Sequence, residues 1–240
     1  MGLGGPLIPA RQSTFAEMDA TLPVTLAAPR VPSTPTHEEL ISRAFESSRL
    51  SLGWVHWRLG LLEQTIKDAD RLDGIAKINT LAGLRAIFSR DIAVLSDKLR
   101  TNKDPLSSEF RSALQKALLL VRRNLYEKSL IIDEGTAGRC DPKFWGGAMP
   151  FAAATPWDPE PRISVCAPWF PMNADLHRDV ITHEFFHLVG LIDKPVIGDT
   201  RDALDDANTM AQVVAYIHDR SRWKDSSGLS KKPTAIYPAP

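Results

Sequence analysis

Five consecutive residues in the last third of the chain combine two imidazoles with one carboxylate: His183, Glu184 and His187 in the run HEFFH. On a helix, the two histidines lie about 40° apart around the axis, so both imidazoles can reach one metal ion. Glu184 lies beside that ligand stripe, where its carboxylate can accept a proton from a metal-bound water. The spacing predicts a catalytic zinc site with His183 and His187 as ligands and Glu184 as the general base.

A site with two histidines needs a further protein ligand, and Asp193 follows His187 by six residues. Gly190 is typical of a helix end, and a turn there lets the chain double back toward the metal. Three later carboxylates are alternative ligands: Asp199, Asp202 and Asp205. Two imidazoles and one carboxylate, with a fourth position open for water, form a catalytic zinc arrangement.

The elements that must position these residues are a helix over about 175–189 and, after a turn, a second helix over about 203–219. In the first helix, apolar residues fall on the face opposite the ligands, where they would be buried against a core. They are Ile181, Phe185, Leu188 and Val189. Upstream, residues 130–132 and 162–166 are short strand candidates, and the segment 140–161, dense in Gly, Pro and Trp, is expected to be mostly loop.

The first half of the chain supplies the support. Residues 1–36 are rich in Pro and show no sustained period, so we expect an extended arm. A capping box, Thr36 with Glu39, then opens a helical region over 37–130, with further helices over about 73–99 and 107–129. We expect this region to pack on a catalytic region over 131–222, which a polar tail, 223–240, follows. The predicted fold is α+β, mainly helical, with a small β-sheet.

Composition sets the limits on partners. The 240 residues carry 29 Lys and Arg against 29 Asp and Glu, and 43% are hydrophobic, which excludes wholesale disorder. The balanced charge argues against nucleic acid as the main partner. The apolar stretch 117–121 is far shorter than the roughly 20 residues of a membrane span, and the N-terminus lacks the basic and apolar regions of a cleavable signal peptide.

The run HEFFHLVGLID resembles the active-site helix of the HExxH zincins. A broader resemblance, over about residues 139–219, is to the aspzincin metallopeptidases (deuterolysin and peptidyl-lysine metalloendopeptidase) and their bacterial effector-like relatives. The segments RCDP and ISVCAPWF, the aspartate after a short loop and the second helix carry it. The resemblance implies a zincin-like fold and a zinc-dependent endopeptidase that hydrolyses peptide bonds in a protein or peptide substrate.

The resemblance also implies roles for residues near the metal. In the family, the segment that matches Asp206-Ala207-Asn208-Thr209 braces a zinc-ligand histidine, a role that falls here to Asp206 or Asn208. Some family members favour Lys after the scissile bond, which requires an acidic pocket. Four aspartates supply acid nearby: Asp199, Asp202, Asp205 and Asp206. For Cys140 and Cys166, the resemblance leaves open a disulfide or two free thiols.

One departure from the family bears on activity. A tyrosine that steadies the tetrahedral intermediate follows the ligand aspartate in the family, but this chain has Lys-Pro-Val-Ile-Gly over 194–198. The oxyanion role would fall to Tyr216, His218 or Arg201, or be partly absent. The alternative function is therefore a catalytically quiet zincin that binds zinc and acts as a protein-interaction module.

Three features bear on where the protein acts: the missing signal peptide, the Pro-rich arm and the likeness to effector-like relatives. We expect a secreted effector or toxin that reaches its target cell without a cleavable signal peptide. Its partners would then include a secretion machine or an immunity protein. Otherwise the protein is expected to be cytoplasmic.

Overall fold

The computed structural model describes residues 34–125, 131–135, 140–141, 150–155, 161–219 and 221–222. The predicted tail and all but the last residues of the predicted arm lie outside these ranges. The chain from Thr36 onward forms one compact unit, and that unit carries every element described below. Among the described residues, no helix combines the length and the apolar character that crossing a membrane requires.

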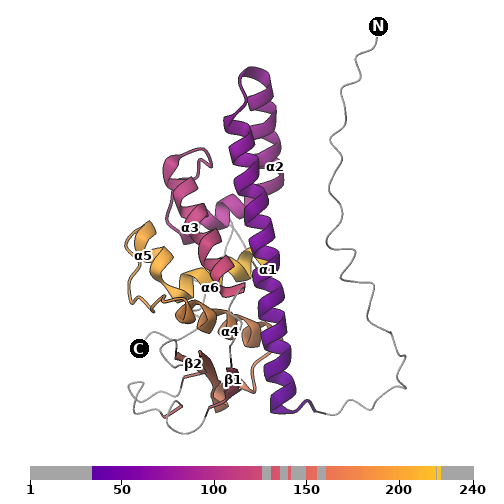
Figure 1. The fold of residues 1–240 in the computed structure, drawn as a ribbon, viewed down its shortest axis with the longest axis vertical. Coiled ribbons are helices and arrows are strands. Elements are labelled where there is room, and N and C mark those ends of the chain that lie inside the picture. Colours follow the sequence, from indigo (N-terminus) through magenta and orange to yellow (C-terminus); the bar gives the residue numbers. More distant parts are fainter. Residues whose placement is uncertain are drawn as a thin grey trace, which may run out of the picture. The chain divides into compact units, whose positions relative to one another are not determined.

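Three helices occupy the first half of this unit: α1 (His37–Asp70), α2 (Gly74–Lys98) and α3 (Ser108–Leu125). The predicted capping box is confirmed, because the Thr36 hydroxyl accepts from the Glu39 N–H while the Glu39 carboxylate accepts from the Thr36 N–H. In Figure 1, α1 runs from the sheet past α4 and α6 and then pairs with α2. This long helix therefore connects the helical region with the elements that carry the site.

The sheet has three short strands: β1 (Ile131–Glu134), β2 (Ala152–Thr155) and β3 (Arg162–Val165). Their order is β1-β3-β2, with β1 parallel and β2 antiparallel to the central β3. The predicted strands correspond to β1 and β3, whereas β2 lies in the segment expected to be mostly loop and was not predicted. Its three alanines have low β-propensity, so β2 forms through its pairing with β3 and its packing on α4.

The last third forms a 3-10 turn, Ala167–Trp169, and then α4 (Ala174–Leu188), α5 (Thr200–Asp205) and α6 (Ala207–His218). Asn173 caps α4 by accepting from the Leu176 N–H. The prediction of one helix over about 203–219 is wrong at Asp206, whose extended backbone (φ −100°, ψ 122°) separates α5 from α6. At that residue the chain pairs with Ile192 in a parallel β-bridge instead of continuing as a helix.

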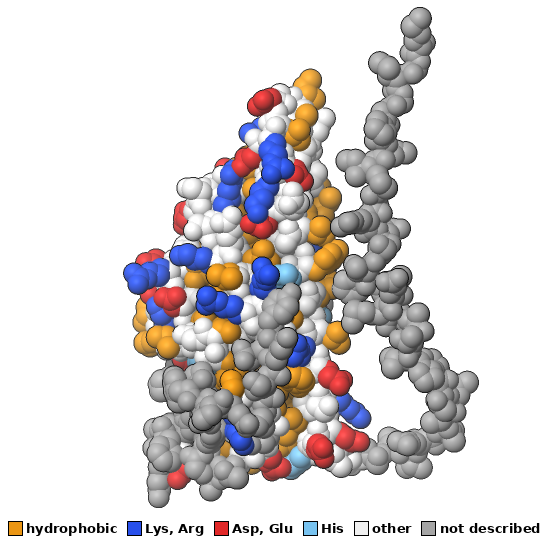
Figure 2. Space-filling view, in the orientation of Figure 1, with side chains coloured by type: hydrophobic (Ala, Val, Ile, Leu, Met, Phe, Trp, Pro, Cys, Tyr) orange, Lys and Arg blue, Asp and Glu red, His pale blue; other side chains and the backbone are white. Residues whose placement is uncertain are grey.

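One hydrophobic core joins both halves of the unit. It takes in side chains of α1 (Leu52, Val55, Leu59), of α4 (Ile181, Phe185, Phe186) and of α6 (Met210, Val213, Val214). The apolar back of the predicted metal helix is thus buried against α1 and α6, with Ile181 and Phe185 fully covered. Other hydrophobic side chains lie at the surface along α1 and α2 (Figure 2), among them Leu50, Trp57 and Ile87.

Candidate metal centre

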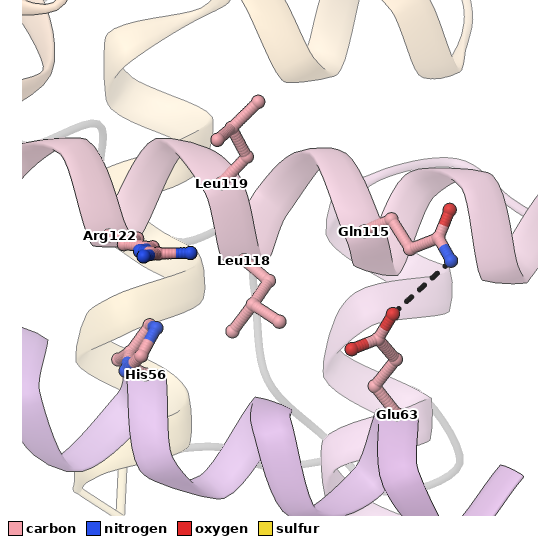
Figure 3. Close-up of a pocket in the computed structure, with 6 residues that line it drawn as sticks. All are labelled: His56, Glu63, Gln115, Leu118, Leu119 and Arg122. Atoms are coloured by element: carbon pink, nitrogen blue, oxygen red, sulfur yellow. Dashed lines mark hydrogen bonds between the residues drawn. The ribbon is translucent and has the colours of Figure 1, made fainter. Parts of the chain in front are cut away.

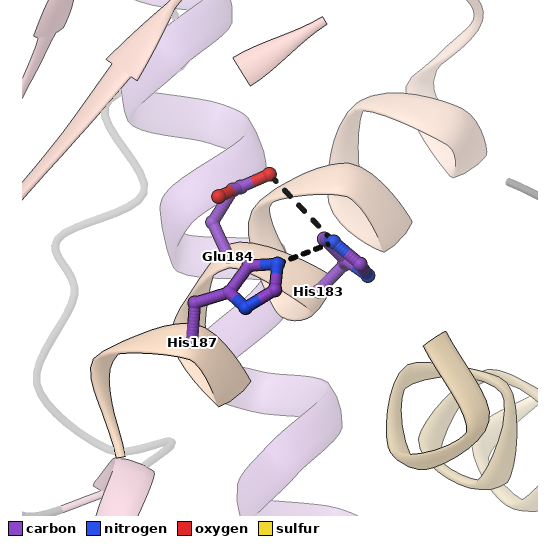
Figure 4. A group of neighbouring side chains, drawn as sticks. All are labelled: His183, Glu184 and His187. Atoms are coloured by element: carbon purple, nitrogen blue, oxygen red, sulfur yellow. Dashed lines mark hydrogen bonds and ion pairs between the residues drawn. The ribbon is translucent and has the colours of Figure 1, made fainter. Parts of the chain in front are cut away.

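Helix α4 brings three side chains of the HEFFH run together. The Nε2 atoms of His183 and His187 lie 2.9 Å apart, and Glu184 Oε1 lies 3.9 Å from His183 Nε2. All three side chains point toward one another in Figure 4. Because one ligand atom from each residue lies within 4.8 Å of the others, this group could hold a metal ion.

His187 is oriented by the turn that follows α4. Gly190 has φ 94°, a left-handed conformation that glycine adopts without strain, and this turn brings the Leu191 carbonyl back toward the helix. His187 Nδ1 donates to that carbonyl over 2.9 Å. Since a carbonyl only accepts, Nδ1 carries the proton in the neutral ring, and Nε2 is left for a metal.

Asp193 reaches both imidazoles. Its Oδ1 lies 3.5 Å from His183 Nε2, and its Oδ2 lies 3.5 Å from His187 Nε2. Ligand atoms around a tetrahedral zinc ion are about 3.3 Å apart, given bonds of about 2.0–2.1 Å. Each carboxylate oxygen lies at about this spacing from one of the two nitrogens, and the histidine pair would have to open by about 0.4 Å. Two imidazoles and one carboxylate therefore fit a zinc ion.

The three alternative carboxylates are engaged elsewhere. Asp199 caps α5 by accepting from the Asp202 N–H. The Lys194 ammonium lies 2.7 Å from an oxygen of Asp202 and 3.7 Å from one of Asp205. Asp193 is therefore the carboxylate that the structure brings to the histidine pair. Lys194 offsets one of the negative charges of the four aspartates, and the acidic pocket for a lysine side chain stays a prediction.

The two residues expected to brace a histidine have other partners. Asn208 donates through Nδ2 to Asp193 Oδ1 over 3.0 Å, so it contacts the carboxylate instead of an imidazole. Asp206 is buried and accepts from two backbone groups, the Lys194 N–H at 2.9 Å and the Thr209 N–H at 2.7 Å. Both residues support the segment that carries Asp193, and the expected contact with a histidine is corrected accordingly.

The pKa values of His183, His187 and Asp193 are shifted in different directions. Burial, together with the charge of His187, lowers the pKa of His183 to about 3. Burial would also lower the pKa of His187, but its hydrogen bond with Asp193 and the charge of Glu184 outweigh that effect and raise this pKa to about 9. Burial would raise the pKa of Asp193, yet the two histidines bring it below its usual value. Without metal, His187 and Asp193 therefore form an ion pair at neutral pH.

The three candidates for the oxyanion role lie on α5 and α6. Tyr216 is eight residues beyond Asn208 on α6, a rise of about 12 Å, and the Lys98 ammonium of α2 lies 5.3 Å from the centre of its ring. His218 packs edge-on against Trp54 of α1. Arg201 is exposed on α5. None of these contacts singles out one of the three, so the oxyanion group stays a prediction.

Cys140 and Cys166 form a disulfide with an S–S distance of 2.07 Å. Of the two states that the sequence left open, the structure contains the bridged one. Cys166 directly follows β3, and the Gly135 N–H extends the β1–β3 pairing by donating to the Val165 carbonyl. A side chain at Gly135 would collide with the sulfur of Cys140, so this glycine is required by the close approach of the bridge.

A groove of about 190 Å³ lies between α1 and α3 (Figure 3). Its lining residues are His56, Glu63, Gln115, Leu118, Leu119 and Arg122. None of them belongs to the group on α4, and the polar pair at one end, Gln115 and Glu63, is already hydrogen-bonded. The groove is therefore a separate feature of the helical region.

Comparison with known proteins identifies no relative. No family model matches the chain, and no match is found among curated proteins or among solved structures. The resemblance to the aspzincins therefore stays a prediction, and function has to be inferred from the chemistry of the site.

The sequence predicted the helix that carries His183 and His187 and named Asp193 as their partner, but it did not predict the contacts that orient these side chains. The Leu191 carbonyl, as a partner of His187, has no side-chain signal that a sequence could display. Asp206 is of a residue type favoured at helix N-caps. Asp199, Asp202 and Asp205 are of the same type, so residue type alone does not locate the break.

Proposed function

We propose that this protein is a zinc-dependent endopeptidase with a zincin-like catalytic region. The observation that carries the proposal is the convergence of Asp193 on the histidine pair, with an oxygen 3.5 Å from each Nε2. Glu184, on the same helix, approaches the pair from a separate position and is the candidate base. This division of the two carboxylates, one as ligand and one as base, is what a hydrolytic zinc site needs.

The donor set favours zinc among the common metal ions. Two imidazole nitrogens and one carboxylate oxygen are the ligands of many catalytic zinc sites, whereas magnesium and calcium prefer sites made of oxygen alone. Both cysteines are joined in the disulfide, so neither offers a thiolate. We therefore propose His183, His187 and Asp193 as the zinc ligands.

Zinc, when bound, lowers the pKa of a coordinated water and polarises the scissile carbonyl. Glu184 is 2% exposed, and burial keeps its carboxylate away from competing solvent. It takes up the proton of the attacking water and passes that proton to the leaving amine. Asp193, whose side chain is 53% exposed, lies at the side of the centre that a substrate can approach.

The test is cleavage of an unstructured protein such as casein by the zinc-loaded protein, with and without a chelator. Glu184→Gln keeps the size and burial of the side chain but removes the base, so we expect zinc to stay bound while cleavage falls by at least about a hundredfold. Cleavage by Glu184→Gln at the wild-type rate would overturn the role of Glu184. Bound zinc without chelator-sensitive cleavage of any substrate would instead favour the interaction module.

We also propose that the protein acts outside a reducing cytosol, as a secreted effector or toxin with a secretion machine or an immunity protein as partner. The disulfide between Cys140 and Cys166 supports this, because such bonds persist in oxidising compartments and are rare in the cytosol. Thiol labelling of the protein in culture medium and in cells tests it. Protein found only in the producing cytosol, with both thiols reduced, would contradict the proposal.

A further inference from the structure

The segment that carries Asp193 is attached to the start of α6 on both sides of that residue. Before it, the Ile192 N–H donates to the Asp205 carbonyl over 3.1 Å, and the Ala207 N–H donates to the Ile192 carbonyl over 3.0 Å. After it, the Lys194 N–H donates to Asp206 Oδ1 over 2.9 Å. These three hydrogen bonds fix the backbone of Asp193 relative to α6.

Asp206 links the two parts through a single carboxylate. Its Oδ2 caps α6 by accepting from the Thr209 N–H, while its Oδ1 holds the Lys194 N–H. The residue is 2% exposed, so water competes little for either bond. The first turn of α6 and the backbone after Asp193 therefore hold a constant position relative to each other.

A fixed backbone does not by itself fix the Asp193 side chain, which is 53% exposed. Asn208, in the first turn of α6, supplies the missing contact by donating from Nδ2 to Asp193 Oδ1 over 3.0 Å. Because an amide N–H₂ donates only, this bond occupies one lone pair of Oδ1 and leaves both lone pairs of Oδ2, the oxygen close to His187.

We propose that Asn208 is a positioning residue that aligns the Asp193 carboxylate for the metal, with Oδ2 as the ligating oxygen. The inference rests on the proposed zinc site and adds how its third ligand is aligned before metal arrives. A ligand that is aligned in advance loses little conformational freedom on binding, so the metal is held more tightly. Without Asn208, the exposed carboxylate rotates among several positions, and that freedom must be given up each time zinc binds.

The test is zinc affinity, measured by competition with a chromophoric chelator at fixed pH. Asn208→Ala should bind zinc about 10- to 100-fold more weakly than the wild type, the usual effect of removing a partner of a metal ligand. Asn208→Gln retains the donor and should recover part of the loss. Asn79→Ala removes an exposed asparagine from α2 and is the matched control, with no expected change.

Thermal unfolding of the metal-free variants separates positioning from folding. Asn208→Ala should unfold within a few degrees of the wild type, and Asn208→Ser, which suits the first turn of a helix, serves if the alanine variant does not fold. Wild-type zinc affinity in either folded variant would overturn the positioning role alone. A wild-type protein that takes up no zinc would overturn the proposed zinc site and this role with it.

Discussion

The two ring nitrogens of His187 have different partners. The Leu191 carbonyl accepts from Nδ1, while Nε2 faces Asp193 and His183. In the metal-free protein, burial lowers the pKa of His187, but Asp193 and Glu184 outweigh burial and raise it to about 9. The imidazole is therefore protonated at neutral pH, and the proton sits on the nitrogen that a metal needs. Metal and proton compete for this atom.

This competition predicts that zinc binding releases close to one proton per chain at pH 7. The apparent zinc affinity should rise about tenfold per pH unit up to about pH 9, since metal binding requires the neutral ring. His183, with a pKa of about 3, adds no proton in this range. Titration calorimetry in two buffers of different ionisation enthalpy measures the released protons. Equal heats in both buffers would contradict the predicted protonation of His187.

Asp193 illustrates what a sequence can supply at this scale. Its distance along the chain from His187 made it a candidate, but three other aspartates remained alternatives. The choice depended on Lys194, which pairs with Asp202 and Asp205, and on the N-cap role of Asp199. Those pairings are contacts in space, and the order of residues alone does not specify them. By contrast, His183, Glu184 and His187 lie within five positions of one another, so their spacing alone predicts that they share one side of a helix.

The break between α5 and α6 fixes the backbone on both sides of Asp193. A continuous helix over 203–219 would leave Asp206 no way to pair with Ile192 or to hold the Lys194 N–H. The interruption places a helix N-terminus beside the segment that carries Asp193. The predicted single helix over about 203–219 did not contain this break.

Asp206 should therefore matter more for stability than an ordinary cap. Asp206→Ala removes one buried and one part-buried hydrogen bond, and we expect it to lower the free energy of unfolding by about 2–4 kcal/mol. Asp199→Ala, which removes the exposed cap of α5, is the matched control and should lower it by about 1 kcal/mol or less. Urea unfolding of the metal-free proteins measures both. Equal losses in the two variants would contradict the linking role of Asp206.

The sheet was harder to predict than the helices. Strand β2 consists of alanines and one threonine, a composition that does not favour strands. It forms because its backbone pairs with β3 and because it packs against α4. Helices α1 to α4 are specified mostly by local signals, namely caps, periodicity and breaks, and these signals predicted them closely.

At the scale of the whole molecule, the described core runs without interruption from α1 through α4 to α6. The helical region is therefore part of the support of α4, which carries the candidate metal centre. Ser48 of α1 and Thr182 of α4 add a buried hydrogen bond of 2.6 Å between their hydroxyls, one residue before His183. The position of His183 and His187 therefore depends on residues more than a hundred positions earlier in the chain.

A shared core predicts cooperative unfolding. Tryptophan fluorescence, which reports in part on Trp54 and Trp57 of α1, and far-ultraviolet circular dichroism should give one coincident urea transition. Two separate transitions would show that the helical region and the metal-binding region fold independently.

The disulfide should contribute to the same transition. Cys140 and Cys166 are 26 residues apart, and closing a loop of that length stabilises the folded state by about 3–4 kcal/mol in the chain-entropy model. The double variant Cys140→Ser/Cys166→Ser should lose about this amount in urea unfolding. If the double variant unfolded at the same urea concentration as the wild type, the predicted stabilisation by the disulfide would be contradicted.

The central claim is that His183, His187 and Asp193 together hold one zinc ion. X-ray absorption at the zinc edge of the protein loaded with one equivalent of zinc tests it most directly, with Asp193→Ala measured in parallel. We predict two imidazole nitrogens and carboxylate oxygen at about 2.0–2.1 Å, no sulfur, and loss of the carboxylate contribution in the variant. A spectrum with fewer than two imidazoles, or one that Asp193→Ala leaves unchanged, would contradict the account.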